Sequence, residues 1–262
     1  MKKIFAIILA AMLLLTLVSC GNKQEEAKDS GIEDVIDANV YTDKTTGDKF
    51  VFEPDDLGGY VIVSFTSATS TPHKVVIPAE IDNVEVTGIG AGAFKFNGYV
   101  SEVEIPDSVI YVDNFAFYGC EYLAKVTMAD SVTDLGAGAF EHCVALTDVK
   151  LSNSLKEISD YLFNNCKTLA AVAIPEAVTE IGDGAFMGCA FTEVTIGASV
   201  KKIGDCAYYN IKTLTKATVP ATVENLGQFV FNAAAEGFVL AGAEGSVAQT
   251  YAAENEYTFV VA

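Results

Sequence analysis

The sequence predicts an elongated β-rich α/β solenoid, a right-handed coil of parallel strands with about 7 turns of 22–23 residues, capped at both ends. The first observation is composition: 51% of the 262 residues are hydrophobic, yet after residue 20 they recur at short intervals and not in long runs. The second is a repeat with spacings of 23, 23, 23, 22 and 23 residues. Its units begin at Val103, Val126, Val149, Val172, Val194 and Ala217.

Each position of the repeat, counted as an offset from the first residue of its unit, has a structural reason. Offsets 0 and 2 are apolar and would alternate inward on a short strand. Proline at offset 3 (Pro106, Pro175 and Pro220) lacks an amide hydrogen and would end that strand. Glycine at offset 10 lets the backbone turn, and it is found at Gly136, Gly182, Gly204 and Gly227.

Offset 14 is aromatic in every unit. The residues are Phe117, Phe140, Phe163, Phe186, Tyr208 and Phe231, and Phe94 holds the same place in the first, irregular unit. We expect these rings to stack as a spine inside the coil. The alternative is an exposed aromatic stripe that binds a ligand.

The pattern IP-x-x-V-x-x-IG-x-x-AF-x-x-C-x-x-L, over residues 60–262, resembles the BspA-like (Treponema-type) leucine-rich repeats of bacterial surface proteins. The resemblance implies a non-enzymatic surface protein that recognises a host, another bacterium or an extracellular macromolecule. The unit from Val149 departs from the pattern, with Ser152 in place of proline and Ser159 in place of glycine. We expect these to be local irregularities that leave the fold intact.

Solenoid ends need caps, because an open turn exposes its core. We expect an N-terminal β cap at residues 33–74, with a hairpin of segments 40–42 and 49–53. The repeats would occupy residues 75–240. The C-terminal cap, residues 241–262, would be a helix opened by a capping box of Ser246 and Gln249, followed by a strand at 257–261.

The N-terminus has the organisation of an export signal. Lys2 and Lys3 precede an apolar stretch over residues 4–15, so residues 1–19 are predicted to be a signal peptide. Residues 17–20 read LVSC and look like a bacterial lipobox, which implies lipidation of Cys20 and attachment to the cell membrane at the surface. Polar residues 20–32 would then be a flexible linker. An ordinary signal peptide with a chance cysteine is the alternative.

The formal net charge is −19, and all 16 basic residues are lysine. Nucleic-acid binding depends on basic patches and arginine forks, so nucleic acid is excluded as a partner. We expect no cofactor, metal or catalytic residue, and a monomer.

Four cysteines recur at offset 17: Cys120, Cys143, Cys166 and Cys189. We expect a column of free, buried thiols, with one or two disulfides or a metal as alternatives, because parallel side chains suit neither well. His142 beside Cys143 could suggest a nucleophile pair, but sequence neighbours point apart, so a surface histidine is expected. Asp55 and Asp56 fit a solvated turn better than a calcium loop.

The outward side chains of the first strand, at offsets −1 and +1, form the candidate binding face. Its residues are Glu102, Glu104, Lys125, Thr127, Asp148, Lys150, Glu193, Thr195, Lys216 and Thr218. Their alternating charges could instead fix strand register and aid solubility. We expect an adhesion or binding module for extracellular protein or glycan. The alternatives are an envelope scaffold that binds a partner of the same cell and, less favoured, an extracellular hydrolase.

Overall fold

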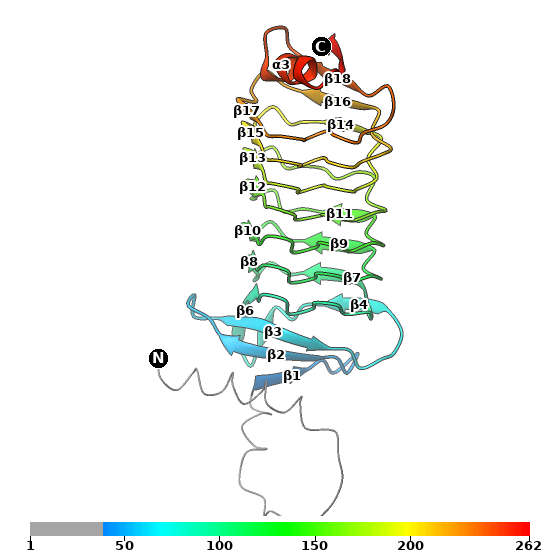
Figure 1. Cartoon of the computed structure of the whole chain (residues 1–262). Coiled ribbons are helices and arrows are strands. Elements are labelled where there is room, and N and C mark those ends of the chain that lie inside the picture. Colours follow the sequence, from blue (N-terminus) through cyan, green and yellow to red (C-terminus); the bar gives the residue numbers. More distant parts are fainter. Residues whose placement is uncertain (1–38) are drawn as a thin grey trace, which may run out of the picture. The chain divides into compact units, whose positions relative to one another are not determined.

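The computed structural model describes residues 39–262, which form a compact unit with their own core. The predicted signal peptide, the Cys20 lipidation site and the linker lie outside the described residues. Figure 1 shows the coil with its N-terminal strands at one end and the helix α3 at the other.

Short parallel strands stack in two columns along the coil (Figure 1). The first column consists of β3 (Tyr60–Thr66), β6 (Val84–Ile89), β8 (Tyr111–Val112), β10 (Asp134–Leu135), β12 (Glu157–Ile158), β13 (Glu180–Ile181), β15 (Lys202–Ile203) and β17 (Asn225–Leu226). The second consists of β4 (His73–Val76), β7 (Val100–Ile105), β9 (Lys125–Met128), β11 (Asp148–Lys150), β14 (Glu193–Thr195), β16 (Lys216–Val219), β18 (Val239–Gly242) and β19 (Thr258–Val261).

The predicted fold class, a parallel-strand leucine-rich-repeat coil, is confirmed, with little helix. The expected number of turns was wrong, because the coil has about 9 rather than about 7. Segments that the sequence suggested were caps also stack on the repeats: β3 pairs in parallel with β6, and β18 pairs in parallel with β19.

The aromatic residues at offset 14 form the predicted internal spine. Successive rings from Phe94 to Phe231 stack with centroids 4.7–5.8 Å apart, and every one is buried. The ends of the spine are covered by further rings, Phe65 against Phe94 and Tyr251 against Phe231. The spine is therefore core, and the alternative of an exposed aromatic stripe at this offset is wrong.

The two ends of the coil are closed by different elements. At the N-terminal end, β1 (Val40–Thr42) and β2 (Lys49–Pro54) pair antiparallel as the expected hairpin, and β2 continues antiparallel with β3. A second small hairpin joins β5 (Glu80–Ile81) to β6. At the C-terminal end, α3 (Val247–Glu254) packs against β18.

The predicted capping box at the start of α3 does not form. Ser246 is the N-cap residue, but its side chain accepts no capping hydrogen bond and instead donates to the Ala243 carbonyl. Gln249 Oε1 accepts from the Gly245 amide, one residue before the cap, at 2.7 Å. The sequence motif was present, but the preceding turn provides a nearer partner for the hydroxyl.

One turn, residues 149–171, pairs its strands differently with its two neighbours. On one side its strand β11 pairs with β9 of the turn before; on the other side its strand β12 pairs with β13 of the turn after. Each column of strands is consequently interrupted once, between β10 and β12 in the first and after β11 in the second. Residues 171–174, which the repeat predicts as a strand, form none.

Ser159 provides a physical reason for the missing pairing between β10 and β12. The glycines at offset 10 donate their N–H to the preceding turn at 2.7–2.8 Å, as Gly136 does to the Val112 carbonyl. A Cβ on Gly136 would lie 2.3 Å from the Asn114 nitrogen, so a side chain there pushes the turns apart. Ser159 carries that Cβ, and its Oγ, rather than its N–H, bonds the Leu135 carbonyl. Asp113 has the same offset, and its N–H does bond the Ile89 carbonyl of the preceding turn, but that turn is the irregular first unit.

Candidate binding surfaces

The predicted binding face lies at the surface of the second strand column. Thr127 and Thr218 are half-buried, and the other eight side chains are exposed. Register brings Glu102, Lys125 and Asp148 side by side, with Lys125 and Asp148 paired at 3.1 Å. Glu193 and Lys216 are neighbours farther along the coil.

This face is interrupted in the middle. Between β11 and residues 173–177 lies a hollow of about 610 Å³, whose lining includes Val149, Leu151 and Ile174. The outward positions of the intervening turn carry Ala171 and Ala173, both exposed, so neither charge nor strand pairing continues across it. The structure therefore brings the ten predicted residues together as two separate stripes and not as one surface.

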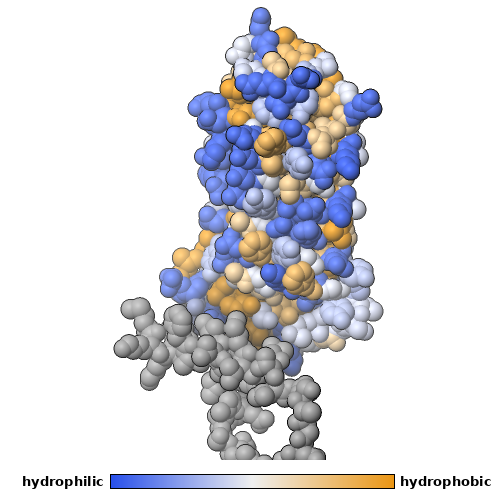
Figure 2. Space-filling model, in the orientation of Figure 1, coloured by the Kyte–Doolittle hydropathy of each residue, from blue (hydrophilic) through white to orange (hydrophobic). Residues whose placement is uncertain are grey.

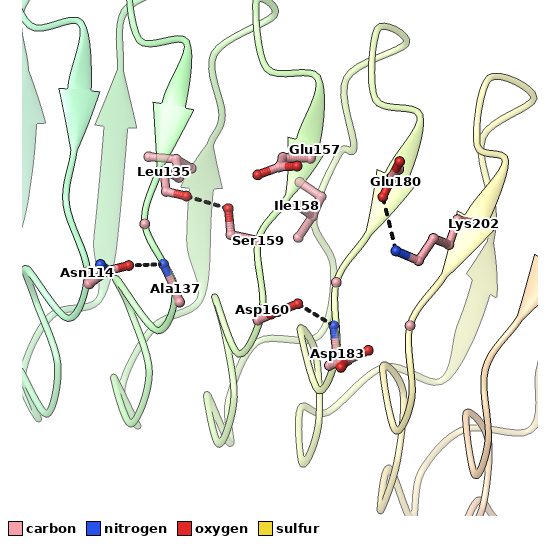
Figure 3. Close-up of a pocket in the computed structure, with 13 residues that line it drawn as sticks. Asn114, Leu135, Ala137, Glu157, Ile158, Ser159, Asp160, Glu180, Asp183 and Lys202 are labelled. Atoms are coloured by element: carbon pink, nitrogen blue, oxygen red, sulfur yellow. Dashed lines mark hydrogen bonds and ion pairs between the residues drawn. The ribbon is translucent and has the colours of Figure 1, made fainter.

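A polar groove follows the other column of strands. It has a volume of about 460 Å³ and runs over successive turns around the place where β10 and β12 are not paired (Figure 3). Its polar lining residues are Asn114, Glu157, Ser159, Asp160, Glu180, Asp183 and Lys202. We call it the β10–β12 groove.

Hydrogen bonds between turns fix one wall of the β10–β12 groove. Asn114 Oδ1 accepts from the Ala137 amide and Asp160 Oδ1 from the Asp183 amide, each at 2.7 Å (Figure 3). Glu180 and Lys202 pair at 3.3 Å across the next two turns. These contacts hold carboxylate and amide groups in defined positions, which a ligand could use without first ordering them.

Large aromatic side chains are exposed on the loops that follow the groove. At offset 12 stand Phe115 (40% exposed), Tyr161 (44%) and Phe229 (54%). Each has a positive φ of 55–57°, in the left-handed region that bulky residues seldom adopt. In the space-filling view, hydrophobic residues lie in small patches among hydrophilic ones (Figure 2).

The aromatic residues at offset 12 alternate with glycine along the first turns. Gly138 follows Phe115 one turn on, and Gly184 follows Tyr161. A Cβ on Gly138 would lie 2.6 Å from the Phe115 ring, and one on Gly184 would lie 2.6 Å from the Tyr161 ring. Each ring therefore occupies the space above the next turn's glycine, so rings can recur only at every second turn.

The cysteines at offset 17 form the expected column of free thiols. Each Sγ donates to the carbonyl of a spine phenylalanine at 3.1–3.3 Å, as Cys143 does to Phe117. Burial raises the pKa of the Cys120 thiol to about 12 and raises those of Cys143, Cys166 and Cys189 as well. These thiols are protonated and inward-facing, as structural residues should be.

His142 is separated from the neighbouring thiol. Its ring packs edge-on to Tyr118 with centroids 5.4 Å apart, and its Nε2 lies 3.7 Å from Glu141 Oε1, while Cys143 bonds inward. Asp55, proposed as a turn residue, accepts hydrogen bonds from the amides of Leu57 and Gly59, both at 2.9 Å. Both expectations, a surface histidine and a turn, agree with these contacts.

Within residues 39–262, no group of three or more His, Cys, Asp or Glu side chains is arranged to hold a metal ion. Over the same residues, no helix has the length and apolar character needed to span a membrane.

The chain belongs to the family described as the BspA type leucine-rich repeat region. Six copies of the repeat match, over residues 87–215 and 179–236, which together span more than half of the chain. Leucine-rich-repeat surface proteins of this family are generally protein-interaction modules. No curated protein sequence matches the chain.

Solved structures are similar to the chain. A leucine-rich cell surface protein from Faecalibacterium prausnitzii is 28% identical, with a TM-score of 0.50 over 73% of this chain and 55% of that one. A leucine-rich repeat protein from Eubacterium ventriosum shares the fold at 22% identity, with a TM-score of 0.60 over 71% and 50%. The T. pallidum leucine-rich repeat protein does so at 22% identity and 0.52, over 80% and 95%. The chain thus spans about half the length of the first two.

The predicted binding face consists of offsets −1 and +1 and therefore does not include the exposed rings, which are at offset 12. The alternation of Phe115, Gly138, Tyr161 and Gly184 was readable from the aligned units. The groove beside them was not, because it is lined by side chains of several turns around a place where one strand pairing is missing.

Proposed function

We propose that this chain is a lipid-anchored binding module that recognises an extracellular macromolecule at the outer face of the cell. The observation that carries the proposal is the set of exposed aromatic rings on loops of a hydrogen-bonded coil. Aromatic side chains are enriched in recognition surfaces because a few rigid torsions present a large contact area. The backbone at offset 12 is left-handed in successive turns, and Gly138 and Gly184 adopt it without the cost of about 1–2 kcal/mol that an aromatic residue has there.

The proposed location rests on two further points. A protein 28% identical to this chain carries the description "leucine rich cell surface protein". The LVSC motif at residues 17–20 follows a charged and then apolar N-terminus, the order that lipoprotein export requires. Acyl chains on Cys20 would hold the coil at the membrane, since each buried CH₂ contributes about 0.8 kcal/mol.

A binding screen tests the recognition function. The soluble unit, starting near residue 33, is immobilised and exposed to extracellular proteins and glycans, and a bacterial host displaying the full chain is compared with one displaying a chain that lacks residues 33–262. Binding that requires these residues supports the proposal. Capture restricted to envelope proteins of the producing cell would replace it with the scaffold function.

The anchor is tested separately. Cys20→Ala should abolish metabolic labelling with a fatty-acid analogue and leave the precursor uncleaved or the protein released. Labelling equal to that of the parent chain would refute a lipid on Cys20, whatever the binding screen shows.

A further inference from the structure

We propose that the β10–β12 groove, together with the rings of Phe115 and Tyr161, binds a neutral, extended, β-1,4-linked polysaccharide. The proposal rests on the binding function above and names its ligand class and site.

The rings lie beside the groove. The Phe115 ring lies over Gly138 and the Tyr161 ring over Gly184. The residues directly before these glycines, Ala137 and Asp183, line the groove, as do Asn114 and Asp160 directly before the rings (Figure 3). A pyranose has an apolar face of C–H groups and a rim of hydroxyls. An aromatic ring next to fixed amide and carboxylate groups matches both features, since the ring stacks on the face and the polar groups bond the rim.

The spacing of the rings favours an extended chain. Spine rings of the same turns, Phe117, Phe140 and Phe163, are 5.3 and 5.8 Å apart. Phe115 and Tyr161, two turns apart, are therefore separated along the coil by roughly 10–11 Å, close to the length of two sugar units in a straight β-1,4-linked chain. Such a chain turns the same face of every second sugar to one side. Because a ring fits only at alternate turns, the coil offers one stacking position to every second sugar.

The charge of the groove selects against anionic glycans. Glu157, Asp160, Glu180 and Asp183 all line it, with Lys202 as its one cation among the described lining residues. Lys202 is already paired with Glu180 at 3.3 Å. A carboxylated or sulfated polysaccharide would bring like charges together, whereas neutral hydroxyls can donate to the carboxylates.

The floor of the groove adds main-chain hydrogen-bonding groups. Elsewhere in this column each turn donates to the one before, as Thr133 does to Ile110 and Thr179 to Lys156, both at 2.8 Å. Between β10 and β12 the corresponding strand pairing is missing among the described residues. The Leu135 carbonyl accepts a hydrogen bond from Ser159 Oγ, and the remaining unpaired backbone groups of these two strands are left to water or to a ligand.

The experiment is titration calorimetry of the soluble unit with three oligosaccharides. Cellohexaose is neutral and extended, maltohexaose is neutral and curved, and an oligogalacturonate is extended and anionic. Cellohexaose is expected to bind, and the other two at least about tenfold more weakly. Equal binding of all three, or a preference for either of the other two, would overturn the ligand class.

Glycine variants test the rings without threatening the fold. Phe115→Gly and Tyr161→Gly introduce the residue that Gly138 and Gly184 already provide at this offset, so the melting temperature should change little. Each variant should weaken cellohexaose binding about tenfold or more. Tyr122→Ala is the matched control, since Tyr122 is 55% exposed but lies away from the groove lining. Unchanged affinity in both glycine variants would exclude the rings.

One more pair of variants distinguishes the β10–β12 groove from the predicted binding face. Glu157→Ala should weaken cellohexaose binding, and Glu102→Ala, on the second strand column, should not. The reverse result would place the ligand on the predicted binding face. If no oligosaccharide binds but an extracellular protein does in the broader screen, this inference fails and the proposed function stands; if neither binds, both fail.

Discussion

Replacing Gly136 by alanine tests whether glycine at offset 10 sets the spacing of the turns. A Cβ on Gly136 would lie 2.3 Å from the Asn114 nitrogen and 2.5 Å from the Asp113 carbonyl carbon. Both are backbone atoms that cannot rotate away, so the two turns must separate. Separation would lengthen or break the 2.7 Å hydrogen bond from the Gly136 amide to the Val112 carbonyl.

The magnitude can be worked from these contacts. Overpacking of this kind costs about 1–3 kcal/mol, and a lost backbone hydrogen bond about 0.5–1.5 kcal/mol. Replacing glycine by alanine also stabilises the fold by about 0.4–1 kcal/mol, because it lowers the conformational entropy of the unfolded chain. We expect Gly136→Ala to lower the free energy of unfolding by about 2 kcal/mol. For a domain of this length that is a drop of roughly 4–8 °C in melting temperature.

Two comparisons make the measurement specific. Gly136→Ser should lose less than Gly136→Ala, because its hydroxyl can bond the Val112 carbonyl as Ser159 bonds that of Leu135. Gly197→Ala is the control, because a Cβ there meets no atom within 4 Å. Thermal and urea unfolding of the soluble unit provide the values. If Gly136→Ala proves as stable as Gly197→Ala, steric contact at offset 10 does not set the spacing, and our explanation of the missing β10–β12 pairing is wrong.

Three further predictions concern the core and the N-terminal end. Phe140→Ala should lower the free energy of unfolding in urea by about 3–5 kcal/mol. Phe229→Ala, whose ring is 54% exposed, should lower it by well under half of that. Equal losses would contradict an internal spine. In thiol labelling of the native unit near pH 8, the half-buried Cys206 should react first. The four cysteines of the column should react only in denaturant. Labelling of all five at one rate would mean that the column is open to solvent. Burial alone would lower the pKa of His73, but its hydrogen bonds to the Asp48 carboxylate at 2.7 Å and to Thr71, with the Asp48 charge, raise it. The stabilisation is therefore complete below the unfolded pKa of about 6.5 and is lost as pH rises through the folded value. His73→Gln should accordingly reduce the gain in melting temperature on acidification to about pH 6, and an unchanged gain would exclude the pair.

Local pattern was enough to place the interior residues. Phe140 and Cys143 recur at fixed offsets, and each was correctly expected to stack with its counterparts, because equal-length turns bring equal offsets into register. The hairpin around residues 43–48 was equally local, since turn residues between two alternating segments predict it. The capping box at Ser246 failed because its hydroxyl found the Ala243 carbonyl, a competition that a four-residue motif does not describe.

The candidate site was much less predictable. Glu102 and Lys125 were correctly placed at the surface, but the sequence did not show that their face is divided at Ala171–Ala173. Ser159 was noted as a departure and expected to have only a local effect. Strand pairing is nevertheless missing beside Ser159, between β10 and β12, because its Oγ and not its N–H bonds the Leu135 carbonyl.

The sequence by itself determined the repeat, the buried spine, the thiol column and the family, because all of these follow from a period that is visible along the chain. Only the tertiary structure decided where the coil is interrupted, which groove opens there and which rings border it. The physical reason is that turn spacing depends on contacts between atoms about 23 residues apart, such as Gly136 against Asn114, and a single Cβ changes that spacing without changing the period.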